Sequence, residues 1–367
     1  MTWRAWWRWP AQTQRSLACA AAQAVAAMQL AARPRVMPPR CAVRHAVTCC
    51  AATPPPLPAS RRAVLHAAAA SALLLVGPPV RAGETQAEVE VAAATSSLEP
   101  LFTAAELPWP GPSFGYAKQL YYPDWLFGEW RVESKLVAFS TPRGEALAPR
   151  NAARAAAEDM QRAVRFRARF YSTLPDSASN SFRVALGALP QDAIMADRAF
   201  NCASLANATA AAAPGAKPDA PPVVSSVEYD PREAPDTMRV LYTGGGRAEL
   251  FLSAMRADPL PEGAPPPSVF HTAECSRQTT LGVQRVDVSD YQILSRYLLQ
   301  SPGLVTLRQR VGVYLTPQDE AYFSAINAAV ALYDYDLTLE REERAGEGEG
   351  GGPLVCVQTP KDVVQCR

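Results

Sequence analysis

Few residues of this 367-residue sequence combine the types and spacing that catalysis requires. Asp334 and Asp336 alternate along one expected strand, where their charges can couple, and such paired carboxylates can serve as acid and base. Polar residues that point outward from a half-buried strand explain the pair at least as well. The run Gly244, Gly245 and Gly246 could hold a phosphate, but no Lys or helix start follows it. We therefore expect a tight turn there.

One histidine, His271, lies outside the N-terminal 82 residues, with Cys275 four positions later. A zinc site needs three or four ligands, and four positions along a strand separate two residues by about 13 Å. Axial ligation of a haem and a Ser-His-Asp triad are alternatives, although no nucleophile-elbow motif accompanies the histidine. We expect an exposed His271, no metal site, no cofactor and no catalytic residue.

Two patterns could bind something without catalysis. Arg165, Arg167 and Arg169 share one face of an expected strand. Pairing across the sheet with residues such as Glu133 would make them a solvated outer face, and docking to an acidic partner is the alternative. Gln309 interrupts the apolar face of another strand, and an inward polar group must find a partner or a cavity. It is a candidate ligand contact, with a satisfied core glutamine as the alternative.

The N-terminal 82 residues do not have the composition of a folded domain. They contain ten Arg but no Lys, Asp or Glu, which is typical of an organelle transit peptide, expected over residues 1–60. Residues 61–82 begin with Arg61 and Arg62, continue with an apolar run and end in a small-x-small pattern at Ala82. The run is shorter than the ~20 residues of a membrane span. We expect a twin-arginine export signal cleaved after Ala82, with a buried helix or membrane anchor as the alternative.

This bipartite leader resembles that of thylakoid-lumen proteins, which implies a chloroplast protein delivered to the thylakoid lumen. Its removal would leave 26 basic against 35 acidic residues. A negative net charge disfavours nonspecific binding to nucleic acid or anionic lipid, so we expect neither partner, and no stable membrane span in the mature protein.

Four cysteines follow the leader: Cys202, Cys275, Cys356 and Cys366. We expect a bridge between Cys356 and Cys366, which are close in sequence and share a short tail. Cys202 lies on the apolar stripe of an expected helix, where we expect a reduced thiol.

The chain divides into segments of different composition. Residues 83–118 are expected to be a linker, with folded chain beginning near Leu120. Residues 119–341 contain nine or ten alternating segments typical of strands. A helix is expected over 191–207, with a disordered insertion at 208–222, and residues 342–367 are expected to form a flexible linker and tail.

The start of the first strand resembles the lipocalin and calycin pattern. Gly128 and Trp130 form Gly-x-Trp after a Pro-Asp-Trp turn, and residues 289–291 (Ser-Asp-Tyr) partly match a later family motif. The resemblance implies a mainly β fold, an antiparallel lipocalin-like barrel of roughly eight to ten strands with one short helix after a disordered leader. It also implies that Trp130 closes one end of the barrel, that Gly128 permits close approach of the chain, and that Arg341 packs over the Trp.

Four further segments resemble recurring segments of an uncharacterised family of cyanobacterial and chloroplast lumenal proteins. They are "YYPDWLFGEWRV", "ADRAFN", "YLTPQD" and "ALYDYDLTLER". The family has no known function, so the resemblance implies a compartment and a fold but no chemistry.

Three functions remain open from the sequence. The first is a non-enzymatic accessory protein of the thylakoid lumen that contacts a photosynthetic protein complex, for example in assembly or maintenance of a photosystem. The second is a lipocalin-like carrier of an apolar small molecule such as a quinone, pigment or isoprenoid. The third is an enzyme of unknown reaction. An interior filled by side chains would favour the first, and a cavity would favour the second.

Overall fold

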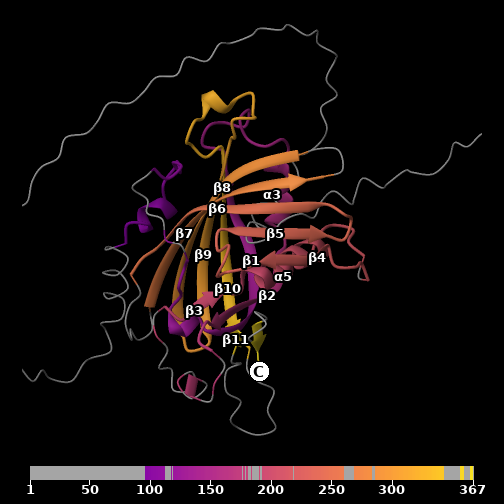
Figure 1. Ribbon diagram of the computed structural model, residues 1–367. Coiled ribbons are helices and arrows are strands. Elements are labelled where there is room, and N and C mark those ends of the chain that lie inside the picture. Colours follow the sequence, from indigo (N-terminus) through magenta and orange to yellow (C-terminus); the bar gives the residue numbers. More distant parts are fainter. Residues whose placement is uncertain are drawn as a thin grey trace, which may run out of the picture. The chain divides into compact units, whose positions relative to one another are not determined.

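One curled β-sheet is the main element of the described residues, seen in a computed structural model (Figure 1). Its strands are β1 (Gly128–Ser140), β2 (Ala163–Ser172), β3 (Ile194–Ala196), β4 (Val224–Tyr229), β5 (Thr237–Tyr242), β6 (Arg247–Ala257), β7 (Ser268–Leu281), β8 (Val286–Ser301), β9 (Leu304–Tyr314), β10 (Ala331–Arg341), β11 (Cys356–Gln358) and β12 (Val364–Cys366). Neighbours follow the order β12-β11-β2-β1-β10-β9-β8-β7-β6-β5-β4, and β3 pairs with β2. All pairings are antiparallel except one short parallel contact between β11 and β2.

The structure describes residues 96–111, 117, 119–175, 177, 179–180, 183, 190, 192–217, 219–259, 268–282 and 286–342, and the backbone of 356–358 and 364–366. The leader, with Arg61, Arg62 and the expected cleavage site at Ala82, lies outside the described residues.

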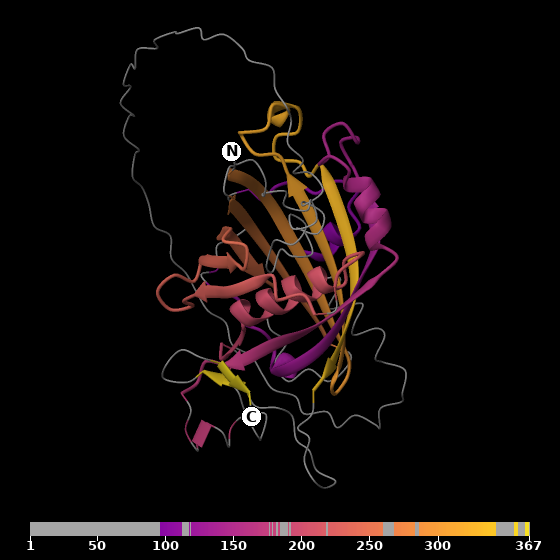
Figure 2. The same ribbon diagram turned by 90° about the vertical axis from the view of Figure 1, so that its right-hand side faces the viewer.

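The predicted mainly β, antiparallel fold is confirmed, and the sheet has the form of a half-barrel (Figure 2). Alternation along each strand places the larger core on the concave face, as in β10, where Tyr333, Tyr335, Leu337 and Leu339 are all buried there. The predicted turn between β5 and β6 is also present. Gly245 adopts φ +84°, a conformation that residues with a side chain rarely adopt.

The convex face is covered by the segment that precedes the sheet. The 3-10 helix η1 (Glu99–Phe102) buries Phe102, and Leu98 and Leu107 are buried beside it against Leu332 and neighbouring residues of the sheet. A Cβ at Gly312 would lie 2.8 Å from Leu107, so glycine is what permits this close approach. The prediction that folded chain begins near Leu120 is therefore wrong for residues 96–109, whose few apolar residues show no periodic face.

Two α-helices and two further 3-10 turns complete the described chain: α3 (Ala152–Asp159), α5 (Arg198–Ala211), η3 (Asp124–Leu126) and η4 (Tyr322–Ser324). The helix expected over 191–207 begins later, because the Asp197 side chain accepts a hydrogen bond from the amide of Phe200 and caps the helix there. Met195, inside the expected range of the helix, lies instead in β3. The helix ends at Ala211, inside the expected insertion.

Helix α5 spans the gap between the two ends of the half-barrel. On β2, the Asn201 side chain accepts from the Arg169 amide at 2.6 Å and donates to its carbonyl at 3.1 Å, while Ser204 accepts from the Arg167 amide at 3.0 Å. On β4, Asn207 accepts from the amide of Val224 at 2.9 Å. Side chains of one helix thus satisfy backbone groups on both strands, in place of the pairing that would close a barrel.

Candidate ligand-binding cavity

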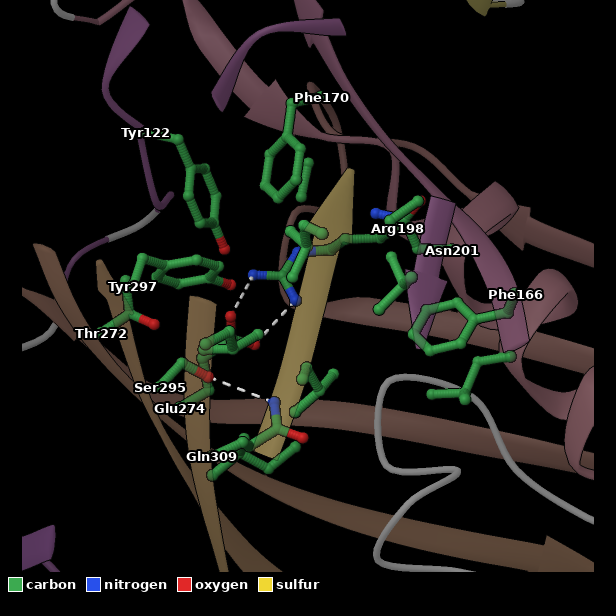
Figure 3. A pocket seen from close by; sticks show the side chains of 18 residues that line it. Tyr122, Phe166, Phe170, Arg198, Asn201, Thr272, Glu274, Ser295, Tyr297 and Gln309 are labelled. Carbon is green, nitrogen blue, oxygen red and sulfur yellow. Dashed lines mark hydrogen bonds and ion pairs between the residues drawn. The ribbon is translucent and has the colours of Figure 1, made fainter. Parts of the chain in front are cut away.

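A cavity of about 130 Å³ lies between α5 and the concave face of the sheet (Figure 3). Its walls come from α5, the segment before β1, and strands β1, β2, β3, β7, β8, β9 and β10. Apolar side chains form much of the lining: Val132, Phe166, Phe170, Leu205, Ile293, Leu307, Leu337 and Leu339. The polar lining gathers around two groups, an ion pair and a glutamine. An apolar space with a few convergent polar groups is the usual composition of a small-molecule site.

The ion pair joins α5 to β7 inside the core. Arg198 is the first residue of α5, and its Nη1 and Nη2 donate to the two carboxylate oxygens of Glu274 at 2.7 and 3.2 Å. Burial opposes a charge on Arg198, but Glu274 more than offsets it and the pKa of Arg198 is raised. The two charges therefore neutralise each other, and the pair locks the start of the helix against the sheet.

Two tyrosines complete the polar end of the cavity. The hydroxyl groups of Tyr122 and Tyr297 point toward the Arg198–Glu274 pair (Figure 3), and the two rings meet edge to face at 6.0 Å. Burial is the main cause that raises the pKa of both hydroxyls, with a smaller contribution from Glu274. Both hydroxyls consequently stay protonated and can donate as well as accept hydrogen bonds.

Gln309 on β9 lies at a separate point of the cavity wall. Its Nε2 donates to Ser295 Oγ on β8 at 3.2 Å, while its Oε1 is buried and finds no partner among the described residues. The sequence singled out this glutamine because it interrupts an apolar strand face. The sequence left two possibilities, a satisfied core glutamine and a ligand contact. The structure combines features of both, because the amide nitrogen has a partner and the amide oxygen faces the cavity.

The Gly-x-Trp motif stands beside this cavity as part of the same core. Trp130 is fully buried, and its Nε1 donates to the carbonyl of Leu126 in η3 at 2.7 Å. The Arg341 guanidinium lies 4.7 Å from the centre of the Trp130 ring, and its Nη2 donates to the carbonyl of Trp125 at 2.6 Å. Gly128 has φ +115° at the start of β1. The expected packing of Arg341 over Trp130 is thus present, in the arrangement that the lipocalin resemblance implies.

A comparison with protein families finds one match that covers most of the described sheet. A family model described as a domain of unknown function, DUF6816, matches residues 115–343. The chain belongs to this family. No curated protein and no solved structure matches it. The DUF6816 domain spans β1 to β10 and the whole cavity lining, so the cavity is a feature of the domain and not of the terminal segments.

The arginine stripe of the DUF6816 domain is paired within the sheet. Arg165 donates to Glu133 at 2.7 Å, Arg169 lies 3.0 Å from Glu129, and Arg167 contacts Glu129 and Glu342. Arg165 keeps 80% of its side chain exposed and Arg169 only 22%. The cross-strand ion pairs are present, but only part of the face is open to solvent, because the Glu129 side chain is 3% exposed. Docking of this stripe to an acidic partner stays a proposal.

The expectation of an exposed His271 is wrong. The side chain is 2% exposed, with Nε2 2.6 Å from Glu99 of η1 and Nδ1 2.9 Å from Asp258. The covering segment 96–109, expected to be a linker, buries it. Arg296 contacts the same Glu99 carboxylate at 3.2 Å. His271 therefore helps attach the N-terminal segment to the convex face.

Asp334 and Asp336 differ in a way that their spacing does not predict. Asp336 is exposed, whereas Asp334 is buried and accepts two hydrogen bonds from Arg310 at 2.6 and 2.9 Å. Arg310 also donates to the carbonyls of Leu101 and Ala104. Asp334 therefore holds an arginine that fastens segment 96–109, and the two carboxylates do not form an acid–base pair.

The cysteines are placed only in part. Cys202 is disulfide-bonded, so the prediction of a reduced thiol is wrong, and its partner lies outside the described side chains. Cys275 is free and buried. Cys356 and Cys366 stand directly opposite each other in the β11–β12 pair, but their side chains lie outside the described residues. Their bridge stays a prediction.

No group of three or more His, Cys, Asp or Glu residues among the described residues could hold a metal ion. None of the described helices has the length and apolar character to cross a membrane.

Reasoning from the sequence missed the ion pair and both tyrosines of the cavity. One signal was available for Glu274, which shares its strand face with the buried Phe270 and Thr272. A carboxylate on an inward face requires a buried cation as its partner, so Glu274 by itself predicts that an arginine or lysine from another segment reaches it.

Proposed function

We propose that the DUF6816 domain of this chain is a small-molecule carrier that binds an apolar, ring-sized group inside the half-barrel. The observation that carries the proposal is the cavity of about 130 Å³ between α5 and the sheet. An apolar protein cavity of about 150 Å³ is known to take up benzene. The volume is close to this figure and suits one ring, so a larger molecule such as a quinone would place only its ring inside, and an isoprenoid only part of its chain.

The lining supports binding without requiring a charged ligand. Arg198 and Glu274 neutralise each other, and the surrounding wall of Phe166, Leu205 and Leu307 is apolar. Transfer of apolar surface from water into such a space is worth about 25 cal/mol per Å². A neutral molecule of mainly apolar surface is the class of ligand that gains most from this site.

The proposal is tested by filling the cavity. Ala168 lines it on β2, and Ala168→Leu would occupy part of the free volume. Ala138→Leu on β1 makes the same change at an exposed position and serves as control. We expect toluene to raise the melting temperature of the wild-type protein and of the control, but not of Ala168→Leu. No effect of toluene on any of the three would overturn the carrier proposal.

A complementary experiment addresses the natural ligand. The protein is purified under native conditions, and its extracted small molecules and co-purifying proteins are identified by mass spectrometry. A stoichiometric ring-containing molecule supports the carrier. A defined protein complex without any small molecule supports the alternative of an accessory protein.

One surface favours that alternative. The loop between β9 and β10 carries Phe323, which is 84% exposed, and the half-exposed Ile326. Large apolar groups at an exposed tip are typical of contact residues. If partner contact is the function, Phe323→Ser will reduce co-purification of the complex, whereas reversal of Arg165 will reduce it only if the arginine stripe is the docking surface.

The proposed compartment is the thylakoid lumen, where the accessory protein or carrier would act in chloroplasts. The support is the acid-free leader with Arg61, Arg62 and the small-x-small end at Ala82. The reaction of any enzyme in this fold is not part of the proposal.

A further inference from the structure

The orientation of one amide narrows the class of ligand. Nε2 of Gln309 donates to Ser295 Oγ on the neighbouring strand, which turns Oε1 toward the cavity (Figure 3). That oxygen is buried, and no described residue donates to it. Buried polar atoms in folded proteins almost always have a partner, so an unpartnered acceptor in a cavity wall marks the place of a missing donor.

The ion pair and the two tyrosines form a separate polar group at the other end of the cavity. The guanidinium of Arg198 is bound to the carboxylate of Glu274, and the hydroxyl groups of Tyr122 and Tyr297 lie close to that pair. Gln309 differs because its acceptor stands among apolar neighbours, with Leu307 on the same strand face and Leu337 and Ile293 on the adjacent strands. A ligand that packs there meets an apolar wall and one acceptor.

We infer that the ligand is an uncharged ring that bears a hydrogen-bond donor, such as a phenol or another hydroxylated ring, whose hydroxyl donates to Oε1 of Gln309. This inference rests on the proposed carrier function and specifies its ligand. Among the expected ligands it favours reduced or hydroxylated rings, such as a quinol head group, over quinones, whose ring oxygens only accept hydrogen bonds. A carboxylate-bearing ligand is disfavoured because Glu274 already neutralises the Arg198 charge.

The test compares phenol with toluene, in which a methyl group replaces the hydroxyl. Dissociation constants of both are measured by calorimetry for the wild type, for Gln309→Met and for Gln300→Met. Methionine keeps the length of glutamine without the amide. Gln300 is the matched control because it also donates to a hydroxyl, that of Thr306 at 3.0 Å, but is exposed.

We expect the preference for phenol over toluene to fall roughly two- to tenfold in Gln309→Met, the range that a net hydrogen bond supports. The preference should be unchanged in Gln300→Met. Because the phenol-to-toluene ratio of each variant is compared with that of the wild type, the different hydration of phenol and toluene cancels.

The remaining outcomes are distinguishable. If both rings bind and Gln309→Met leaves their ratio unchanged, the inference about the donor is overturned while the carrier stands. Anisole, which can only accept hydrogen bonds, tests the reverse orientation of the amide. If Gln309→Met lowers the preference for anisole over toluene and leaves that for phenol unchanged, Nε2 faces the ligand, and the inference about the donor is also overturned. If neither ring binds the wild type, the carrier proposal itself fails.

Discussion

At the scale of single residues, Trp130 is held by contacts with three parts of the core. Its ring is enclosed by the core, its Nε1 is satisfied by Leu126, and Arg341 covers one face. A guanidinium over a desolvated indole adds a cation–π contact to the apolar burial. The Trp therefore connects the start of β1 to the end of β10, which are partners in the sheet.

We predict that Trp130→Ala lowers the free energy of unfolding by about 3–5 kcal/mol, the usual cost of removing a core aromatic. Chemical denaturation with urea measures it. Phe323→Ala is the control, because that aromatic side chain is 84% exposed and should change stability by less than about 0.5 kcal/mol. A Trp130 variant as stable as the control would show that the motif has no structural role.

A second residue-scale prediction concerns Asp258 beside His271. Burial opposes ionisation of Asp258, but hydrogen bonds from His271 and Ser96 outweigh it and lower the pKa of this carboxyl. A group with a lowered pKa in the folded state stabilises the protein at higher pH, and this contribution is lost as the pH falls below about 4. Glu99, Arg296 and Arg256 are the other charged groups close by.

Asp258→Asn should therefore cost about 1–3 kcal/mol at neutral pH and flatten the loss of stability between about pH 4 and 2. Urea unfolding at a series of pH values measures both effects. Asp336→Asn, at an exposed position of β10, should leave the pH profile as it is. An unchanged acid limb in Asp258→Asn would refute the prediction.

At the scale of elements, α5 decides whether the half-barrel encloses a cavity. Its polar side chains bind backbone groups of β2 and β4, while its first residue reaches Glu274 on β7. The helix is thus attached at three points around the concave face. Loss of one attachment should loosen the helix before it unfolds the sheet.

We predict that Asn201→Ala destabilises the protein by about 1–2 kcal/mol. The change should also speed amide hydrogen exchange in residues 198–211 and at Arg169, because both side-chain hydrogen bonds of Asn201 go to the backbone of Arg169. Exchange followed by mass spectrometry reads this out. Thr209→Ala on the same helix should have little effect. Equal exchange in the two variants would mean that the asparagine does not hold the helix.

The cysteines of the tail strands β11 and β12 have two possible disulfide pairings. Cys356 and Cys366 are cross-strand neighbours, a placement compatible with the spacing of a disulfide, yet Cys202 is already bonded and Cys275 is free. In a protein cleaved after Ala82, a bridge to Cys202 would have to come from one of the two tail cysteines. Because Cys275 is free, that bridge and the Cys356–Cys366 bridge cannot form in the same mature molecule. Peptide mapping under non-reducing conditions decides between them, and a link from Cys202 to the tail would contradict the predicted Cys356–Cys366 bridge.

At the scale of the whole molecule, the proposed leader would determine the compartment in which the domain works. Cleavage after Ala82 would leave Gly83 as the first residue, or a near neighbour. N-terminal sequencing of the protein from isolated thylakoids tests this expectation. Replacement of Arg61 and Arg62 by Lys should block delivery to the lumen, because twin-arginine export reads the arginine pair. Normal delivery of that variant would remove the support for this route.

The sequence by itself determined the features that depend on local order along the chain. Alternation predicted the strands of an antiparallel sheet, because a strand places successive side chains on opposite faces. The same period identified Gln309 as inward, and Gly-x-Trp pointed to Trp130 and its cover by Arg341. These inferences need only the residues of one strand, or a motif already known from another fold.

Only the tertiary structure decided which distant segments meet. The Arg198–Glu274 pair joins residues 76 positions apart, and nothing in either segment names the other as partner. The burial of His271 depended on segment 96–109, whose few apolar residues carry no periodic signal. The closure by α5 depended on the twist of the whole sheet, which brings β2 and β4 within reach of one helix without letting them pair. The cavity exists because of that closure, so its presence could not be predicted from any single segment.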